Sequence, residues 1–246
     1  MRGMGLALRQ VRFENRAFWR NPAAAFFTFV FPLMFMVIFN VLIGRGNPEA
    51  SRFFTPAIIV FAVITATYTN LAMSVTMARD EGILKRMRGT PLPAWAYLAG
   101  RIGHAIAIGV LLVIIVAAFG AIFYGVEVPW RQLPELMLTL VLGAATFCVL
   151  GLALTAFVPN ADAAPAVVNA TILPLLFISN VFIRLDAAPA WIEAVSRFFP
   201  VRHFADAMLD VYAGSGLAWS DLGVMAAWAL AGAVVALRFF SWEPRQ

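Results

Sequence analysis

The densest charge cluster of the chain lies between residues 77 and 93. Its charged side chains are Arg79, Asp80, Glu81, Lys85, Arg86 and Arg88. Acids followed by bases suit the dipole of a short helix, which Pro91 and Pro93 would end. Ile83, Leu84 and Met87 add an apolar stripe at helical spacing. Such a helix can insert into a groove of a soluble partner, so the chemistry expected here is docking. A loop that is basic only for topological reasons is the alternative.

Groupings that catalyse reactions are missing from the sequence. Lys85 is the sole lysine, and no G-x-x-x-x-G-K-[ST] phosphate-binding loop surrounds it. The apolar runs hold no paired carboxylates, no zinc-type spacing and no Ser/His/Asp grouping. His104 is alone in its run and is interpreted as an interfacial or inter-helix donor. We therefore expect no catalytic residue, no metal ligand and no cofactor on this chain.

Composition indicates a membrane protein. The 246 residues are 62% hydrophobic and 13% charged, against about 45–50% and about 25% in soluble domains. The net charge is +5, but the bases lie beside apolar runs, which indicates orientation in lipid and not nucleic-acid binding.

Long apolar runs predict an all-α integral membrane fold in one transmembrane domain, residues 1–246. The expected spans are residues 22–44, 53–78, 95–125, 136–158, 166–183 and 222–240. Residues 1–21 predict an interfacial amphipathic helix, because Arg9, Arg12, Arg16 and Arg20 share one face. Residues 184–217 are too polar to span and predict a short re-entrant or surface-lying helical pair, an extracytoplasmic cap. Its marker residues are Pro189, Trp191, Pro200 and Asp206.

The distribution of bases predicts the orientation. Six spans put both termini on one side, together with residues 79–93, and this side carries 12 of the 18 Lys and Arg residues. The positive-inside rule makes it cytoplasmic. We expect a multi-pass protein of the cell (inner or plasma) membrane.

Polar side chains inside the second and fifth expected spans have two interpretations. Hydrogen bonds between helices are the commoner use of such groups. The other is the lining of a translocation path, for which the candidates are Thr69, Asn70, Asn169, Ser179 and Asn180.

Two stretches resemble one family. The segment ARDEGILKRMRGTPLP resembles the coupling helix of permeases in the ABC type-two exporter family, which includes drug-resistance and polysaccharide export permeases. The matching residues are Arg79, Glu81, Gly82, Leu84, Met87, Thr90, Pro91 and Leu92. The stretch from Leu173 to Met208 resembles the C-terminal part of the same family. There the matching residues are Pro174, Leu175, Phe177, Ser179, Phe182, Pro189, Trp191, Ile192, Pro200, Asp206, Ala207 and Met208. Phe199 stands where Asn is usual, and Arg202 near where Thr is usual.

The resemblance implies a transporter subunit, not an enzyme, that is driven by separate ABC ATPase subunits. The implied coupling residues are Arg79, Asp80, Glu81, Gly82, Leu84, Lys85, Met87, Arg88, Thr90 and Pro91. Two ATPase copies would bind there and carry ATP and Mg, and a second permease, identical or different, would complete a dimer. The expected cargo is a hydrophobic or amphiphilic compound, drug or lipid-like, leaving the cytoplasm or inner leaflet. The alternatives are export of a lipid-linked glycan, or a membrane-embedded enzyme or assembly factor without transport.

Overall fold

The computed structural model describes residues 2–45, 47–88, 94–184 and 189–240, and this part of the chain consists of helices, turns and loops without a strand. The α-helices are α1 (Arg2–Trp19), α2 (Pro22–Ile38), α3 (Pro48–Ile64), α4 (Asn70–Asp80), α5 (Ile83–Arg88), α6 (Ala94–Tyr124), α7 (Leu133–Thr155), α8 (Ala164–Phe177), α9 (Ala190–Phe198), α10 (Pro200–Ala213) and α11 (Trp219–Phe239). Two π-helical turns, η1 (Phe39–Ile43) and η2 (Thr65–Thr69), and one 3₁₀ turn, η3 (Trp130–Gln132), complete the elements.

Five described helical stretches are long and apolar enough to cross a bilayer. They are Ala25–Ile43, Pro48–Asp80, Trp95–Tyr124, Trp130–Thr155 and Trp219–Phe239. Each exceeds the roughly 18 apolar residues that a crossing helix requires. The predicted all-α integral membrane fold is confirmed.

The stretch expected as the fifth span, residues 166–183, takes a different form. Helix α8 has 14 residues and ends at Phe177, and turns follow through Ile183. At 1.5 Å per residue it is about 21 Å long, against about 30 Å for the hydrocarbon core. The backbone of Asn180 has a positive φ of 54°, a conformation that a continuing helix does not allow.

The central helix is longer than its sequence suggests, because α3, η2 and α4 continue one another from Pro48 to Asp80 over 33 residues. It begins five residues before the expected Phe53. Asn47 caps it by accepting a hydrogen bond from the Glu49 amide at 2.9 Å, and Pro48 occupies the first turn. In the most apolar 18-residue stretch of this helix, 72% of the residues are buried, so the helix forms the middle of the bundle.

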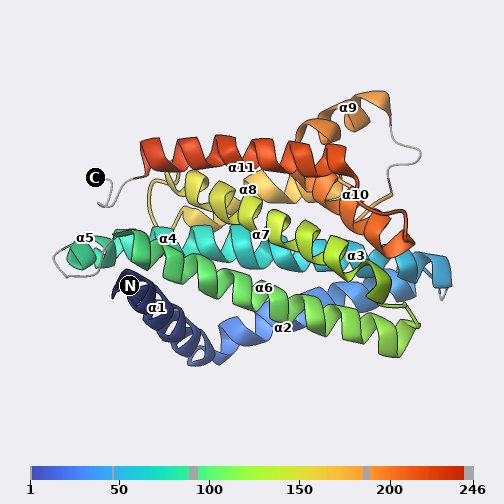
Figure 1. The fold of residues 1–246 in the computed structure, drawn as a ribbon, viewed down its shortest axis with the longest axis horizontal. Helices are drawn as coiled ribbons and strands as arrows, with labels where there is room; N and C mark the ends of the chain where they lie inside the picture. The colour runs from blue at the N-terminus through green and yellow to red at the C-terminus, as the bar shows by residue number, and fades with distance from the viewer. Residues whose placement is uncertain (1, 46, 89–93, 185–188, 241–246) are drawn as a thin grey trace.

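The short helices α5 and α9 lie at opposite ends of the bundle (Figure 1). Helix α5, the first turn of α1 and the last turn of α11 lie at one end, and α9 and the turn between α2 and α3 lie at the other. Helix α10 packs against α3, α7 and α11, and its residues Phe204 and Met208 are fully buried. A Cβ at Gly143 of α7 would lie 2.4 Å from the Phe204 ring. Gly143 therefore allows α7 and α10 to pack closely.

Candidate functional site

A tight turn joins α4 to α5 at one end of the bundle (Figure 1). Gly82 forms it with a φ of 69°, which favours glycine, and the Gly82 amide donates to the Arg79 carbonyl at 3.0 Å. Leu84 is fully buried in an apolar cluster that also contains Val75 and Tyr97. The turn and this buried leucine set α5 at a fixed position against the bundle.

Arg79 and Asp80 fasten the end of α4 to the end of α7 and the turn after it. Arg79 is 1% exposed, and its guanidinium donates to the carbonyls of Thr155 at 2.7 Å and Val158 at 2.6 Å. A longer bond of 3.4 Å reaches the Pro159 carbonyl. The carboxylate of Asp80 accepts a hydrogen bond from the Ala161 amide at 3.0 Å. The positive guanidinium also lies at the C-terminal end of α7, where the partial negative charge of the helix dipole stabilises a cation. We call these contacts of Arg79 and Asp80 the α4–α7 clamp.

The structure divides the expected coupling residues by exposure. Asp80, Glu81, Lys85 and Arg86 are exposed, whereas Arg79 and Leu84 face the chain's own helices. Met87 and Arg88 belong to α5 by their backbone. Thr90 and Pro91 lie outside the described residues. A partner that approached this end would therefore meet the exposed charged residues, while Arg79 and Leu84 hold the segment in place.

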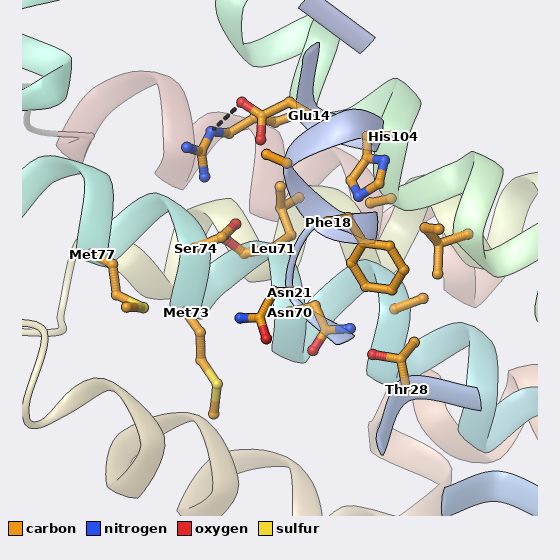
Figure 2. Close-up of a pocket in the computed structure, with 15 residues that line it drawn as sticks. Glu14, Phe18, Asn21, Thr28, Asn70, Leu71, Met73, Ser74, Met77 and His104 are labelled. Atoms are coloured by element: carbon orange, nitrogen blue, oxygen red, sulfur yellow. Dashed lines mark hydrogen bonds and ion pairs between the residues drawn. The ribbon is translucent and has the colours of Figure 1, made fainter. Parts of the chain in front are cut away.

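A cavity of about 350 Å³ lies close to this segment, between α1, α2, α4 and α6 (Figure 2). Figure 2 shows Glu14 and His104 at one side of it and Thr28 at the other, with Asn21 and Asn70 between them. Its other walls are mainly apolar, and they include Phe18, Leu71, Met73, Met77 and Ile108. Its volume falls within the range of small-molecule sites, about 300–1,000 Å³.

The charged side of the cavity joins residues far apart in the sequence. Glu14 Oε1 lies 3.4 Å from Arg101 Nε, and Gln10 Nε2 donates to the same oxygen at 2.9 Å. The Arg101 guanidinium also lies 5.1 Å from the centre of the Tyr97 ring. Sequence reasoning missed this pair. The signal was present, since Glu14 is the only acid before Glu49, and Arg101 is the only charged residue of α6.

The residues expected along a translocation path do not share one cavity. Asn70 follows the π-helical turn η2 and lines the cavity described above. Asn180 lines a second cavity, about 640 Å³, with Arg184 and Asp210. Ser179 is fully buried, while Thr69 and Asn169 are half-buried in η2 and α8.

Hydrogen bonds between helices are observed among the polar groups of these segments. The hydroxyls of Tyr68 and Thr171 lie 2.8 Å apart and join η2 to α8. Outside these two spans, the Ser51 hydroxyl of α3 donates to Asn40 Oδ1 of η1 at 2.6 Å. The bond between Tyr68 and Thr171 is a helix–helix contact of the first interpretation.

The expected cap forms two helices with different surroundings. Pro189 precedes α9, on which Trp191 is exposed, and Pro200 is buried in the first turn of α10. Asp206 pairs with Arg202 and accepts a hydrogen bond from Asn180 Nδ2 at 2.8 Å. The bond from Asn180 to Asp206 therefore connects the turn after α8 to α10.

Two contacts attach this pair of helices to α11. His203 Nδ1 lies 2.6 Å from Asp221 Oδ1, and Trp228 Nε1 donates to the Phe198 carbonyl at 2.9 Å. Asp210, on the same pair of helices and outside the long apolar stretches, has a raised carboxyl pKa. Burial is the main cause, and the negative charges of Asp221 and Asp206 add to it.

The five membrane-length helical stretches and the cavities between helices define the class: a helical membrane protein that holds cavities within its bundle. Comparison with known proteins then gives the family. The family described as ABC-2 type transporter matches residues 9–212, and the chain belongs to this family.

The relatives are named as transport permeases. The chain is 28% identical over 196 residues to the inner membrane transport permease YadH of Escherichia coli K12, which covers 78% of this chain and 72% of that protein. It is 25% identical over 222 residues to the daunorubicin resistance ABC transporter permease protein DrrB1 of Streptomyces coeruleorubidus, covering 85% and 75%. The putative transport permease YvfS of Bacillus subtilis is 20% identical over 228 residues, covering 92% and 93%. The chain is thus a multi-pass membrane permease, and the predicted family is confirmed.

Proposed function

We propose that this chain is the membrane subunit of an ATP-driven exporter, docked through α4, α5 and the turn between them to ABC ATPase subunits in the cytoplasm. The observation that carries the proposal is the exposed surface formed by Asp80, Glu81, Lys85 and Arg86 on a segment that Arg79 and Leu84 anchor. An anchored docking helix can transmit a push, whereas a loose loop would absorb it. Two ATPase copies, each with ATP and Mg, and a second permease copy or a similar permease would complete the transporter.

The α4–α7 clamp gives this push a route through the permease. A displacement of α5 moves the end of α4, and Arg79 and Asp80 carry it to Val158 and Ala161, at the turn that leads into α8. ATPase closure would then favour one arrangement of the helices over another, because the ATPase contacts differ between the two states. The proposed direction of transport is export, from the cytoplasm or the inner leaflet outward.

The arrangement of charges supports a cytoplasmic position for α5 in the inner or plasma membrane. The first turn of α1, the last turn of α11 and α5 lie at the same end of the bundle. The sequence segments at that end carry 12 of the 18 Lys and Arg residues. Both termini would therefore be cytoplasmic, on the side where ATP and a soluble partner are available.

A hydrophobic or amphiphilic cargo fits the cavity between α1, α2, α4 and α6 better than a long polar polymer. The walls of the cavity beside α4 are mainly apolar, with a few polar groups that can orient a ligand. The name of DrrB1 associates that relative with daunorubicin resistance, which supports a drug-like or lipid-like cargo. The permease names of this chain's relatives favour a role in transport over a role as a membrane-embedded enzyme.

Charge reversal on the docking surface tests the proposal. Glu81→Lys is expected to abolish co-purification of the permease with a co-expressed candidate ABC ATPase that binds the wild type, because an exposed acid becomes a base at the contact. Glu127→Lys makes the same charge change at an exposed loop position between α6 and α7 and is expected to leave co-purification intact. Equal co-purification of both variants would count against docking at Glu81.

A further inference from the structure

The cavity between α1, α2, α4 and α6 contains two buried nitrogen atoms that have no hydrogen-bond partner among the described residues. They are Arg101 Nε and His104 Nδ1. The Arg101 atom forms an ion pair with Glu14 at 3.4 Å, but without hydrogen-bond geometry. Buried polar groups are nearly always hydrogen-bonded, and each exception calls for an explanation such as strain, a bound water or an ion. Here two of them line one cavity, which a ligand with hydrogen-bonding oxygens would satisfy. Both side chains belong to α6, one turn apart, and line the same side of the cavity.

The charges of this side restrict the ligand. Arg101 is a permanent cation, and the His104 ring nitrogen can donate when it carries the proton, so the two suit an acceptor such as a phosphate or carboxylate oxygen. Glu14 lies beside them and suits an ammonium group. A simple anion would be repelled by Glu14, and a simple cation by Arg101. A head group that carries both charges meets an opposite charge at each position.

The remaining walls suit an apolar body. Phe18, Leu71 and Ile108 are apolar, and Met73 and Met77 have flexible side chains that adapt to irregular shapes. The cavity is open at the surface of the bundle. In addition, α2 exposes most of its apolar side chains, including Phe27, Val30 and Met34. A molecule held in the bilayer would meet these exposed apolar side chains of α2, the helix that contributes Thr28 to the cavity wall.

We propose that this cavity binds a zwitterionic amphiphile. Its ammonium group lies on Glu14, and its anionic oxygens lie on Arg101 and His104. The ligand opens the Glu14–Arg101 pair and replaces each partner with a group of the same charge, so no buried charge is left without a partner. The same chemistry belongs to a phospholipid that stays in place and to a transported compound. Binding requires neither the ATPase nor transport, so this inference and the exporter proposal can fail separately.

Two fluorescent lipids test the charge requirement in the purified permease. The probes are a short-chain phosphatidylethanolamine labelled on its acyl chain and a phosphatidylglycerol with the same chains, which lacks the ammonium group. Arg101→Gln is expected to weaken binding of both lipids by about tenfold, since each loses a charged hydrogen bond. Glu14→Gln is expected to weaken only the phosphatidylethanolamine by a similar factor.

The exposed ion pair of α9 supplies matched controls. Glu193→Gln and Arg197→Gln remove the same charges from a pair that lies outside the cavity, and both are expected to bind the two lipids like the wild type. Equal affinity of the wild type for the two lipids would overturn the proposal. So would an equal loss of both lipids in Glu14→Gln, because that result indicates damaged packing between α1 and α6.

A cavity-filling variant covers the case in which the charge variants fail to fold. Met73→Trp places a larger side chain in the cavity and is expected to weaken binding of both lipids, and unchanged binding would contradict the assignment of the site.

Proteoliposomes that also contain the ATPase separate the two sources of ligand. ATP-dependent movement of the labelled phosphatidylethanolamine between leaflets assigns the site to cargo, and binding without movement assigns it to a resident lipid.

Discussion

Replacing Arg79 with methionine tests the α4–α7 clamp directly. The change keeps a long side chain but removes the donors to the Thr155 and Val158 carbonyls, at 2.7 and 2.6 Å. Both acceptor residues are buried, so water cannot easily replace the guanidinium. Each carbonyl left without a donor costs about 1–3 kcal/mol. Removal of a buried cation recovers part of this cost, because its desolvation no longer opposes folding.

The expected net loss is about 2–4 kcal/mol in the free energy of unfolding. For a chain of this length, such a loss lowers the melting temperature by about 10 °C. Intrinsic tryptophan fluorescence of the permease in detergent measures it during heating. Arg86→Met is the matched control, since Arg86 is exposed and makes one bond of 3.2 Å to the Glu81 carbonyl. It is expected to change stability by less than about 0.5 kcal/mol. Equal melting temperatures for the two variants would refute the clamp.

Two further changes test the packing and the turn that position the site. Gly143→Val places side-chain atoms where the Phe204 ring lies, since even a Cβ would come within 2.4 Å. The expected destabilisation is about 1–3 kcal/mol, and thermal melting should show partial recovery when Phe204→Leu is added; no recovery would mean that another contact is responsible. Gly82→Ala strains the turn between α4 and α5, where φ is 69°, by about 1–2 kcal/mol. Gly82→Asn should cost less because Asn tolerates this conformation, and co-purification of the ATPase should follow the same order; if Ala and Asn behave alike, backbone strain is not the cause.

The limits of sequence reasoning are clearest at the two ends of the central helix. Asn47 and Pro48 are a recognisable helix start, and they place its beginning before the apolar run that predicted the span. At the other end, the acids followed by bases between Asp80 and Arg88, with the apolar stripe that contains Leu84, predicted a helix with a docking surface. This pattern did not distinguish the exposed Glu81 from the buried Arg79, because both are charged and only two positions apart.

The cap illustrates the same limit in a different way. The sequence indicated two short helices, one on each side of Pro200, and both are observed. The sequence left open whether they lie on the surface or enter the bundle. Helix α10 packs against α7, because Gly143 leaves room for the Phe204 ring. That room depends on which face of α7 turns toward α10, and neither stretch of sequence contains this information.

The sequence alone determined the fold class, the family resemblance and the position of the charged segment. Apolar runs of bilayer length must form helices in lipid, where each backbone group needs a partner within its own helix. Only the tertiary structure decided the partners of single charges. The guanidinium of Arg79 meets a carbonyl 76 positions away, and Glu14 meets Arg101 across two helices. Such pairs depend on how far each helix is rotated and how closely it packs, and hydrophobic periodicity sets neither to within one side chain.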